Sequence, residues 1–207
     1  MGITSPEEMQ KIVRRIARTD PAFKLLIKNS QLCSIGSKRN SRGHYETLVS
    51  SILSQQLATK AAETIRNRVK TMAGGKITPE TIAPLSASDL RAAGVSGAKA
   101  RAISELTNAT LDGSLNFHKF PKMSNAEISA ELTALWGVGR WTVEMFLMFH
   151  LGRLDVWPVG DLGVRRGWER LHQLPAQIKP EELELLGAQF SGHQSVVAWY
   201  CWRALEN

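Results

Sequence analysis

The residue of this sequence with the clearest capacity for chemistry is Asp161. It follows Pro158-Val159-Gly160 and precedes a helical pattern that begins at Leu162. At the start of a helix, the positive end of the helix dipole keeps a carboxylate ionised, so that it can stabilise a positive charge developing beside it. An aspartate at this position is also a common helix cap. The local sequence favours the two interpretations equally.

A short turn, Gly137-Val138-Gly139, lies between two helical patterns. The helix before it begins at Ser124, and residues 141–151 continue after it as a nearly uninterrupted apolar helix. The two glycines permit positive φ angles and a very close approach of another backbone. Main-chain N–H groups in such a turn reach phosphate oxygens without reading bases. The pattern predicts a helix-hairpin-helix that grips a DNA backbone.

The charge of the chain favours a polyanionic partner. The formal net charge is +7, and the sequence pI is about 9.7. Lysine and arginine side chains that replace phosphate counterions gain binding free energy from counterion release. The alternative is a surplus that serves only solubility. Hydrophobic residues at 43% and charged residues at 22% are typical of a globular protein.

The two cysteines, Cys33 and Cys201, provide neither a disulfide framework nor a four-cysteine iron–sulfur cluster, and they fit a reducing, intracellular setting. The polar N-terminus lacks the apolar run of a secretory signal. No stretch approaches the length of a membrane span, so we expect no membrane partner.

The elements that must position these residues are helices. Ser5 to Glu8 and Ser124 to Glu127 are capping boxes, and Asp20-Pro21 and Thr78-Pro79 place a cap residue before proline. Alternating strand patterns are almost absent. The 207 residues suit one compact domain or two small lobes. We therefore predict an all-α protein of roughly eight to eleven helices.

Three helical segments carry further candidates. The helix over residues 45–57 packs inward and then exposes Gln55 and Gln56, a pattern that a solvated helix end explains. Residues 90–103 predict a helix, a turn at Ser96-Gly97 and a second helix with Lys99 near its start. That turn can hold a phosphate or serve as a plain connector. The apolar run 195–202 predicts a buried helix whose tryptophans belong to the core.

From about Tyr45 to Trp202, the sequence resembles the helix-hairpin-helix DNA glycosylases, specifically the alkylbase (3-methyladenine) branch of bacteria and yeasts. The segments that carry the resemblance are SILSQQLATKAA, LWGVGRWTVEMF, DVWPVGDLGVRRG and VVAWYCWR, in the expected order. The pattern is most similar to the small yeast-type members, which lack an extra N-terminal β domain. The resemblance implies one two-lobed module over residues 1–207 with a DNA-binding cleft between lobes. Residues about 1–40 and about 160–207 would form one lobe, and residues about 41–159 the helix-hairpin-helix lobe.

The resemblance also implies a monofunctional hydrolase that cuts the N-glycosidic bond of an alkylated nucleotide extruded from the duplex. Asp161 would stabilise the oxocarbenium-like sugar and orient water. Gln56, with Leu57 behind it, would fill the gap in the base stack. Relatives that also cut the strand carry a nucleophilic lysine where this chain has Trp141, so no lyase activity is expected. The aromatic faces offered to the cationic base would be those of Trp141, Tyr45 and Trp157.

Several DNA-backbone contacts follow from the resemblance and from the two turns. They are Gly137, Val138, Gly139, Arg140, Thr142, Ser96, Gly97 and Lys99. The main-chain carbonyls of Thr133, Leu135 and Val138 correspond to a site for a structural Na⁺ or K⁺ ion. No cofactor is expected to be required. The expected partner is double-stranded DNA with alkylated bases or abasic sites, bound by a nuclear monomer.

Some positions depart from the family pattern. Gly160 stands where close relatives have a second carboxylate, and Gly192-His193-Gln194 replaces Pro–aromatic–Arg. Ala58 replaces a histidine, and Trp136 replaces the usual proline or lysine of the hairpin. These departures motivate a second hypothesis, a binder of abasic or damaged DNA that does not excise. A third hypothesis, a helix-turn-helix regulator, requires polar base-reading side chains on the helix after the Gly-Val-Gly turn.

Overall fold

The computed structural model describes residues 3–38, 40–175 and 177–206, and these residues form helices and no strand. The predicted all-α class is therefore confirmed. Internal contacts divide the chain into two units, one of residues 1–39 with 147–207 and the other of residues 40–146. The second boundary that we expected lay further along the chain, near residue 159. None of the described helices combines the length and the apolar character needed to cross a membrane.

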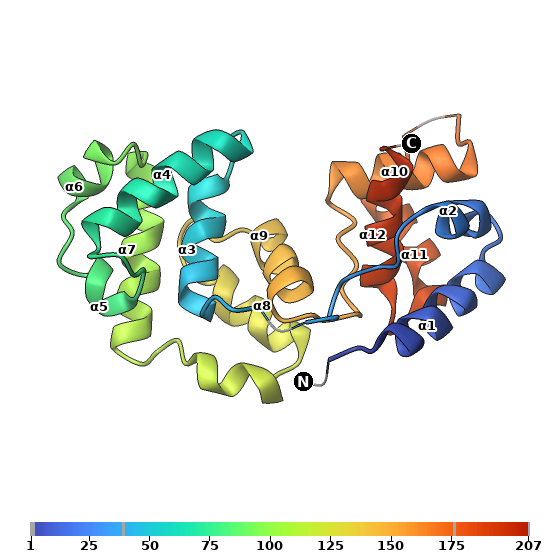
Figure 1. Cartoon of the computed structure of the whole chain (residues 1–207), viewed down its shortest axis with the longest axis horizontal. Coiled ribbons are helices and arrows are strands. Elements are labelled where there is room, and N and C mark those ends of the chain that lie inside the picture. The colour runs from blue at the N-terminus through green and yellow to red at the C-terminus, as the bar shows by residue number, and fades with distance from the viewer. Residues whose placement is uncertain (1–2, 39, 176, 207) are drawn as a thin grey trace. The chain divides into compact units, whose positions relative to one another are not determined.

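The unit of residues 40–146 is built around α3 (His44–Ser54) and α7 (Gly97–Leu111) (Figure 1). Leu48 and Ile52 of α3 are fully buried, as are Ile103 and Leu106 of α7. Serine caps at the starts of α6, α7 and α8 bind the free N–H groups of these helices. Its elements are α3 (His44–Ser54), α4 (Thr59–Met72), α5 (Pro79–Ile82), α6 (Ala87–Ala92), α7 (Gly97–Leu111), the 3-10 helix η1 (Phe117–Lys122), α8 (Asn125–Thr133) and α9 (Arg140–Met145).

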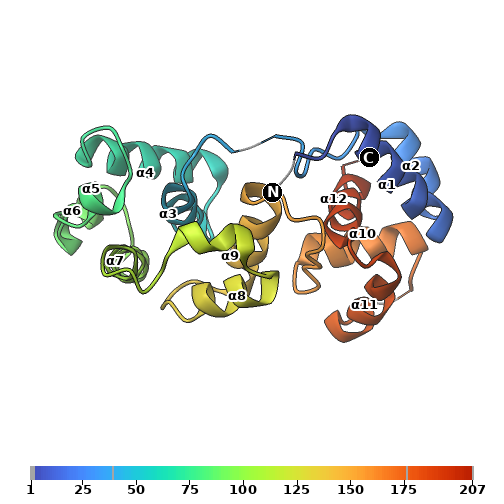
Figure 2. The same ribbon diagram turned by 90° about the horizontal axis from the view of Figure 1, so that it is seen from below.

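The other unit is organised around α10 (Leu162–His172) and α12 (Gln194–Ala204), which lie side by side in Figures 1 and 2. A Cβ added at Gly167 of α10 would lie 1.9 Å from the carbonyl oxygen of Cys201, so only glycine permits this approach. Residues 195–201 are buried, with no residue more than 7% exposed, as the sequence predicted. Trp202, the last residue of the predicted buried run, is only half-buried. The elements are α1 (Pro6–Thr19), α2 (Phe23–Asn29), α10 (Leu162–His172), α11 (Pro180–Gly187), the 3-10 helix η3 (Ala188–Phe190) and α12 (Gln194–Ala204), with the π-helix η2 (Phe146–His150) at the boundary.

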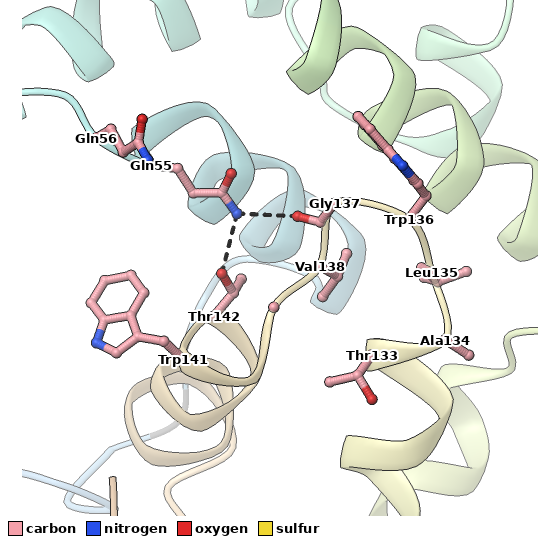
Figure 3. A pocket seen from close by; sticks show the side chains of 11 residues that line it. Gln55, Gln56, Thr133, Ala134, Leu135, Trp136, Gly137, Val138, Trp141 and Thr142 are labelled. Atoms are coloured by element: carbon pink, nitrogen blue, oxygen red, sulfur yellow. Dashed lines mark hydrogen bonds between the residues drawn. The ribbon is translucent and has the colours of Figure 1, made fainter. Parts of the chain in front are cut away.

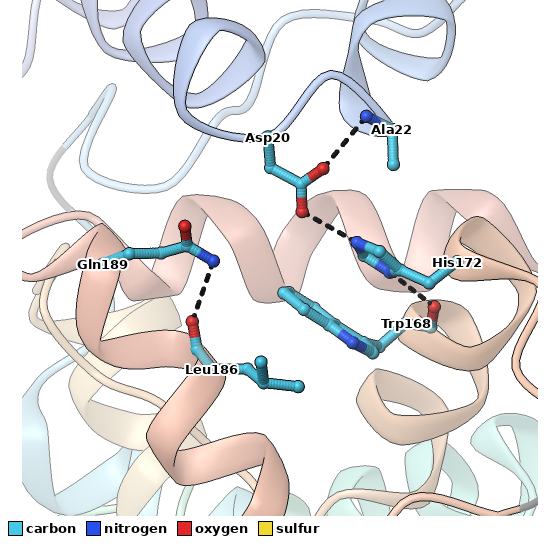
Figure 4. Close-up of polar contacts among 6 residues, drawn as sticks. All are labelled: Asp20, Ala22, Trp168, His172, Leu186 and Gln189. Carbon is cyan, nitrogen blue, oxygen red and sulfur yellow. Dashed lines mark hydrogen bonds and ion pairs between the residues drawn. The ribbon is translucent and has the colours of Figure 1, made fainter.

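A polar contact joins α10 to the turn between α1 and α2 (Figure 4). The Nε2 atom of His172 lies 2.7 Å from Oδ2 of Asp20, and its Nδ1 atom lies 2.9 Å from the carbonyl oxygen of Trp168. The other oxygen of Asp20 accepts the N–H of Ala22 at 3.0 Å. The His172 ring stacks on Trp168 with 4.2 Å between centroids. These contacts hold the turn between α1 and α2 against α10, the helix that Asp161 caps.

Candidate functional site

Figure 3 shows the hairpin between α8 and α9, with Gly137 labelled. This hairpin needs glycine at only one of its two glycine positions. Gly137 has a φ of +80°, and a Cβ there would lie 2.6 Å from the Cβ of Ala102 on α7. Gly139 has a φ of −84° and a ψ of 162° at the N-cap of α9, with no atom within 4 Å of an added Cβ. The expectation of positive φ at both glycines is therefore wrong for Gly139. Its open side leaves room for another molecule to approach the backbone.

The first turn of α9 has no side-chain cap at its start, and its residue Thr142 is buried. Gly139 provides no side-chain cap, so this helix start presents N–H groups that no side chain of the N-cap residue covers. Arg140 is exposed, and its Nε atom donates to Oε1 of Glu144 at 2.8 Å. Thr142 is 3% exposed, and its hydroxyl accepts a hydrogen bond from Gln55. Its side chain thus supports the hairpin, and the expected DNA-backbone contact of Thr142 falls to its main-chain N–H in the first turn of α9.

A hollow of about 860 Å³ lies in front of the hairpin, lined by Gln55, Gln56, residues 133–139, Trp141 and Thr142. The side chains of Trp136 and Trp141 are 41% and 50% exposed. The guanidinium of Arg101, on α7, lies 4.4 Å from the centre of the Trp136 ring. Of the three aromatic residues expected in a base pocket, only Trp141 presents its ring on an exposed surface.

The carbonyls expected to hold a monovalent cation belong to residues that line the same hollow, Thr133, Leu135 and Val138. Carbonyl oxygens are suitable ligands for Na⁺ or K⁺, and the Leu135 oxygen already accepts the N–H of Val138 at 3.2 Å. A carbonyl oxygen has two lone pairs, so this bond is compatible with a second partner. Among the residues that the structure describes, no group of three or more His, Cys, Asp or Glu side chains could hold a metal ion.

The turn that follows α3 presents the expected wedge residues. Gln56 is exposed with a φ of +54°, and Leu57 is 40% exposed. Gln55 is only partly exposed, because its Nε2 atom donates to the Gly137 carbonyl at 3.3 Å and to the Thr142 hydroxyl at 3.2 Å (Figure 3). The interpretation of a solvated helix end thus holds for Gln56 and is wrong for Gln55.

Lys99 does not point outward as a phosphate ligand would. Its Nζ atom donates to the carbonyl oxygens of Leu53 and Gln55, at 2.8 Å each. Burial lowers the pKa of this ammonium from its ordinary value. This geometry opposes the expectation that Lys99 contacts the DNA backbone. Ser96, in contrast, caps α7 with its hydroxyl 3.4 Å from the Lys99 N–H, and Gly97 is exposed at the helix start.

Asp161 is both a helix cap and part of an aromatic cluster in the unit of residues 1–39 and 147–207. Its Oδ1 atom accepts the Val164 N–H at 2.8 Å and the Trp202 indole N–H at 2.9 Å. Phe149 is 51% exposed, and its ring lies 5.7 Å from that of Trp202. An added Cβ at Gly163 would lie 2.8 Å from Trp202, so glycine lets the indole reach the carboxylate. The sequence predicted Trp202 to be a core residue and gave no indication of a role for Phe149. The pattern of an apolar helix does not reveal which of its side chains bonds a distant carboxylate.

Tyr45 and Trp157 are core residues, not parts of an exposed base pocket. Tyr45 is 6% exposed, and its hydroxyl lies 2.7 Å from that of Thr107. Burial raises the pKa of Tyr45 to about 12. Trp157 is 7% exposed and donates its indole N–H to the Leu183 carbonyl at 2.9 Å. An added Cβ at Gly187 would lie 2.1 Å from this indole nitrogen, which shows how tightly the ring is packed.

The helix after the Gly-Val-Gly turn lacks the surface that a helix-turn-helix regulator needs. Thr142, Val143 and Glu144 of α9 are buried. The exposed part of its first turn consists of Arg140 and Trp141. A recognition helix reads bases with several exposed polar side chains, so this geometry opposes the regulator hypothesis.

Comparisons with known proteins agree with the resemblance seen in the motifs. A family model described as "HhH-GPD superfamily base excision DNA repair protein" matches residues 49–190. The chain is 34% identical to DNA-3-methyladenine glycosylase 1 of Schizosaccharomyces pombe, over 95% of this chain and 91% of that protein. It is 26% identical to the alkylbase DNA glycosidase-like protein mag2 of the same yeast, over 97% and 96% of the two chains. The solved structure of the S. pombe 3-methyladenine DNA glycosylase in complex with abasic DNA matches with a TM-score of 0.83 and 32% identity, over 95% of this chain and 97% of that one.

Proposed function

This chain belongs to the HhH-GPD superfamily of base excision DNA repair proteins, and from this premise we propose that it hydrolyses the N-glycosidic bond of alkylated bases in duplex DNA, with Asp161 as its catalytic carboxylate. The chain is a DNA glycosylase by family and by its similarity to named glycosylases over most of its length. The observation that carries the assignment of Asp161 is its second donor. A helix cap needs only the Val164 N–H, whereas the Trp202 indole also orients this carboxylate.

The chemistry needs few protein groups. An alkylated purine such as 3-methyladenine carries a positive charge, so it leaves with the electrons of the C1′–N bond and needs no general acid. The sugar becomes oxocarbenium-like, and Asp161 stabilises that charge. Water then adds its oxygen to C1′ and passes a proton to the carboxylate. Trp202 and Phe149 supply aromatic faces beside Asp161 for a cationic base.

No strand cleavage accompanies this reaction. Trp141 stands where lyase-active relatives carry a lysine, and an indole cannot form a Schiff base with the sugar. The partner in the proposal is duplex DNA with alkylated bases or abasic sites, bound by a monomer that needs no cofactor. A Na⁺ or K⁺ ion at the carbonyls of Thr133, Leu135 and Val138 would shape the hairpin. We place the protein in the nucleus, which imaging of a fluorescent fusion would test.

DNA binding in the proposal centres on the hairpin. The main-chain N–H groups at the start of α9 face a phosphate, since Gly139 leaves its side of the backbone open. Arg140, Ser96 and Gly97 are the other backbone contacts. Gln56 enters the base stack, with Leu57 beside it, and offsets the cost of extruding a nucleotide.

A binder that does not excise is the second candidate, and the departures at Gly160 and Gly192-His193-Gln194 favour it. Similarity to a protein named DNA-3-methyladenine glycosylase 1, at 34% identity over 95% of this chain, supports the enzyme.

One paired assay separates the two candidates. Release of 3-methyladenine from methylated duplex and affinity for a duplex with an abasic-site analogue are measured on the same preparation. We expect wild-type protein to release base and Asp161→Asn to lose about 100-fold or more of the single-turnover rate. Asparagine caps helices as well as aspartate does, so the fold should be retained. Asp155→Asn, an exposed residue of the preceding segment, is the matched control. Tight abasic binding without base release would instead establish the binder.

A further inference from the structure

The turn of residues 54–57, between α3 and α4, holds a strained backbone. Gln55 has a φ of −49° and a ψ of 129°, Gln56 has a φ of +54°, and the Leu57 N–H donates to the Ser54 carbonyl at 3.2 Å. These angles resemble a type II β-turn, which favours glycine at the position of Gln56. A side chain in the left-handed region persists only where its surroundings hold it. The contacts around the turn must therefore supply that restraint.

Lys99 restrains the turn from α7. Its ammonium donates to the carbonyl oxygens of Leu53 and Gln55 at 2.8 Å each, so it binds the last turn of α3 and the first central residue of the turn. A cation is favoured there by the negative end of the α3 dipole. Lys99 lies in the first turn of α7 and is only partly exposed, and its side chain reaches from there to the two carbonyls.

The Gln55 side chain restrains the turn from the hairpin. Its amide nitrogen donates to the Gly137 carbonyl and to the buried Thr142 hydroxyl, as Figure 3 shows. The turn is thus bound on its main chain by α7 and through a side chain by the hairpin. Neither set of bonds uses the Gln56 side chain, which remains exposed.

We propose that Lys99 is a positioning residue, which holds the turn of residues 54–57 in the conformation that presents Gln56 to the base stack, and that it does not bind a phosphate. The proposal rests on the proposed function, because it takes Gln56 as the wedge. Without the ammonium, two carbonyls lose their donor and Gln56 relaxes from its positive φ. The wedge then samples several directions, and nucleotide extrusion slows.

The test compares Lys99→Met with Lys11→Met. Methionine keeps much of the length of the lysine side chain but donates no hydrogen bond, and Lys11 is an exposed lysine on α1 whose replacement removes the same charge. In the free protein, amide hydrogen exchange at residues 55–57 should accelerate about 10- to 100-fold in Lys99→Met and stay unchanged in Lys11→Met. Replacing Gln56 by glycine as well should reduce that acceleration, since glycine adopts the positive φ without strain.

Salt dependence distinguishes positioning from phosphate binding. The slope of log affinity against log salt, for a duplex with an abasic-site analogue, should be the same in Lys99→Met and Lys11→Met. Loss of one phosphate contact would lower its magnitude by about 0.9. In single-turnover base release, Lys99→Met should slow the reaction, and adding it to Gln56→Ala should have little further effect.

Two results would overturn the proposal: unchanged exchange at residues 55–57 in Lys99→Met, or a slope lower by about 0.9 than in the control. Failure of the proposed function looks different, because wild-type protein would then release no base from methylated duplex, whether or not it binds the abasic duplex. The exchange measurement needs no DNA, so it decides whether Lys99 holds the turn in either case.

Discussion

The two hairpin glycines should respond to substitution in opposite ways. At Gly137, alanine meets a left-handed backbone, which costs about 1–2 kcal/mol. Its Cβ would also lie 2.6 Å from that of Ala102, and such overpacking costs about 1–3 kcal/mol. The two effects together predict that Gly137→Ala destabilises the protein by about 2–5 kcal/mol. With a urea m-value of about 2 kcal/mol/M, the midpoint should fall by about 1–2.5 M.

At Gly139, serine should leave the fold intact. The backbone there is extended, no atom lies within 4 Å of an added Cβ, and serine is a preferred N-cap residue. We expect Gly139→Ser to change the free energy of unfolding by less than about 0.5 kcal/mol. The same variant should bind an abasic-analogue duplex more weakly, because its side chain occupies the space where the proposal places the DNA backbone.

Urea unfolding of both variants and binding titrations with the same duplex provide the assay. Ala102→Gly in the Gly137→Ala background is the check on mechanism. It removes the steric overlap but costs about 1 kcal/mol of helix propensity, so it should recover only part of the loss. Two results would contradict this assignment of the glycines: a urea midpoint that falls as much in Gly139→Ser as in Gly137→Ala, or duplex binding by Gly139→Ser as tight as that of wild type.

Two further predictions concern the unit that carries Asp161 and the titration of buried groups. Gly167→Ala should abolish stable folding of the α10–α12 pair, because the added Cβ would lie 1.9 Å from a main-chain oxygen. Gly160→Ala should be tolerated, because no atom lies within 4 Å of an added Cβ there. Soluble yield and thermal melting of both variants measure this difference. Burial raises the pKa of Cys33 to about 12 from an ordinary 9.0, and that of Tyr45 to about 12 from 10.0. Because the unfolded chain releases these protons first, the stability gained from the neutral groups is complete below pH 9 and is lost as pH rises from 9 towards 12. The melting temperature should therefore fall between pH 9 and 11, and both thiols should react with a disulfide reagent at pH 8 only after unfolding; a native protein whose thiols react at once would contradict this.

The sequence predicted the helices, the hairpin and the buried last helix, because each depends on local patterns. The Ser124 capping box and the apolar residues Ile128 and Leu132 specify α8 without knowledge of the rest of the chain. Gly137 was also predicted correctly to have a positive φ. These features are set by backbone preference and by the period of apolar residues, which a single sequence displays.

Side-chain partners were predicted less well, because they depend on contacts between distant segments. A lysine just after a helix start looks like a phosphate ligand, yet the Lys99 ammonium binds carbonyls 44 and 46 residues earlier in the chain. The apolar pattern of α12 did not predict that the indole of Trp202 bonds Asp161. Tyr45 and Trp157 show the converse error, since their aromatic rings fill cores and their polar atoms find partners there.

Helix α7 supports both the hairpin and the turn of residues 54–57. Ala102 of α7 lies against Gly137, and Lys99, three residues earlier on the same face of that helix, holds the carbonyls of the turn that presents Gln56. The proposed backbone grip and the proposed wedge are therefore positioned by one helix, with Gln55 bonded between them. A wedge can fill a gap in the base stack only if it enters at a fixed distance from the phosphate that anchors the strand. Support from a single rigid element sets that distance without requiring the DNA to order the turn first, which lowers the entropic cost of extruding the nucleotide.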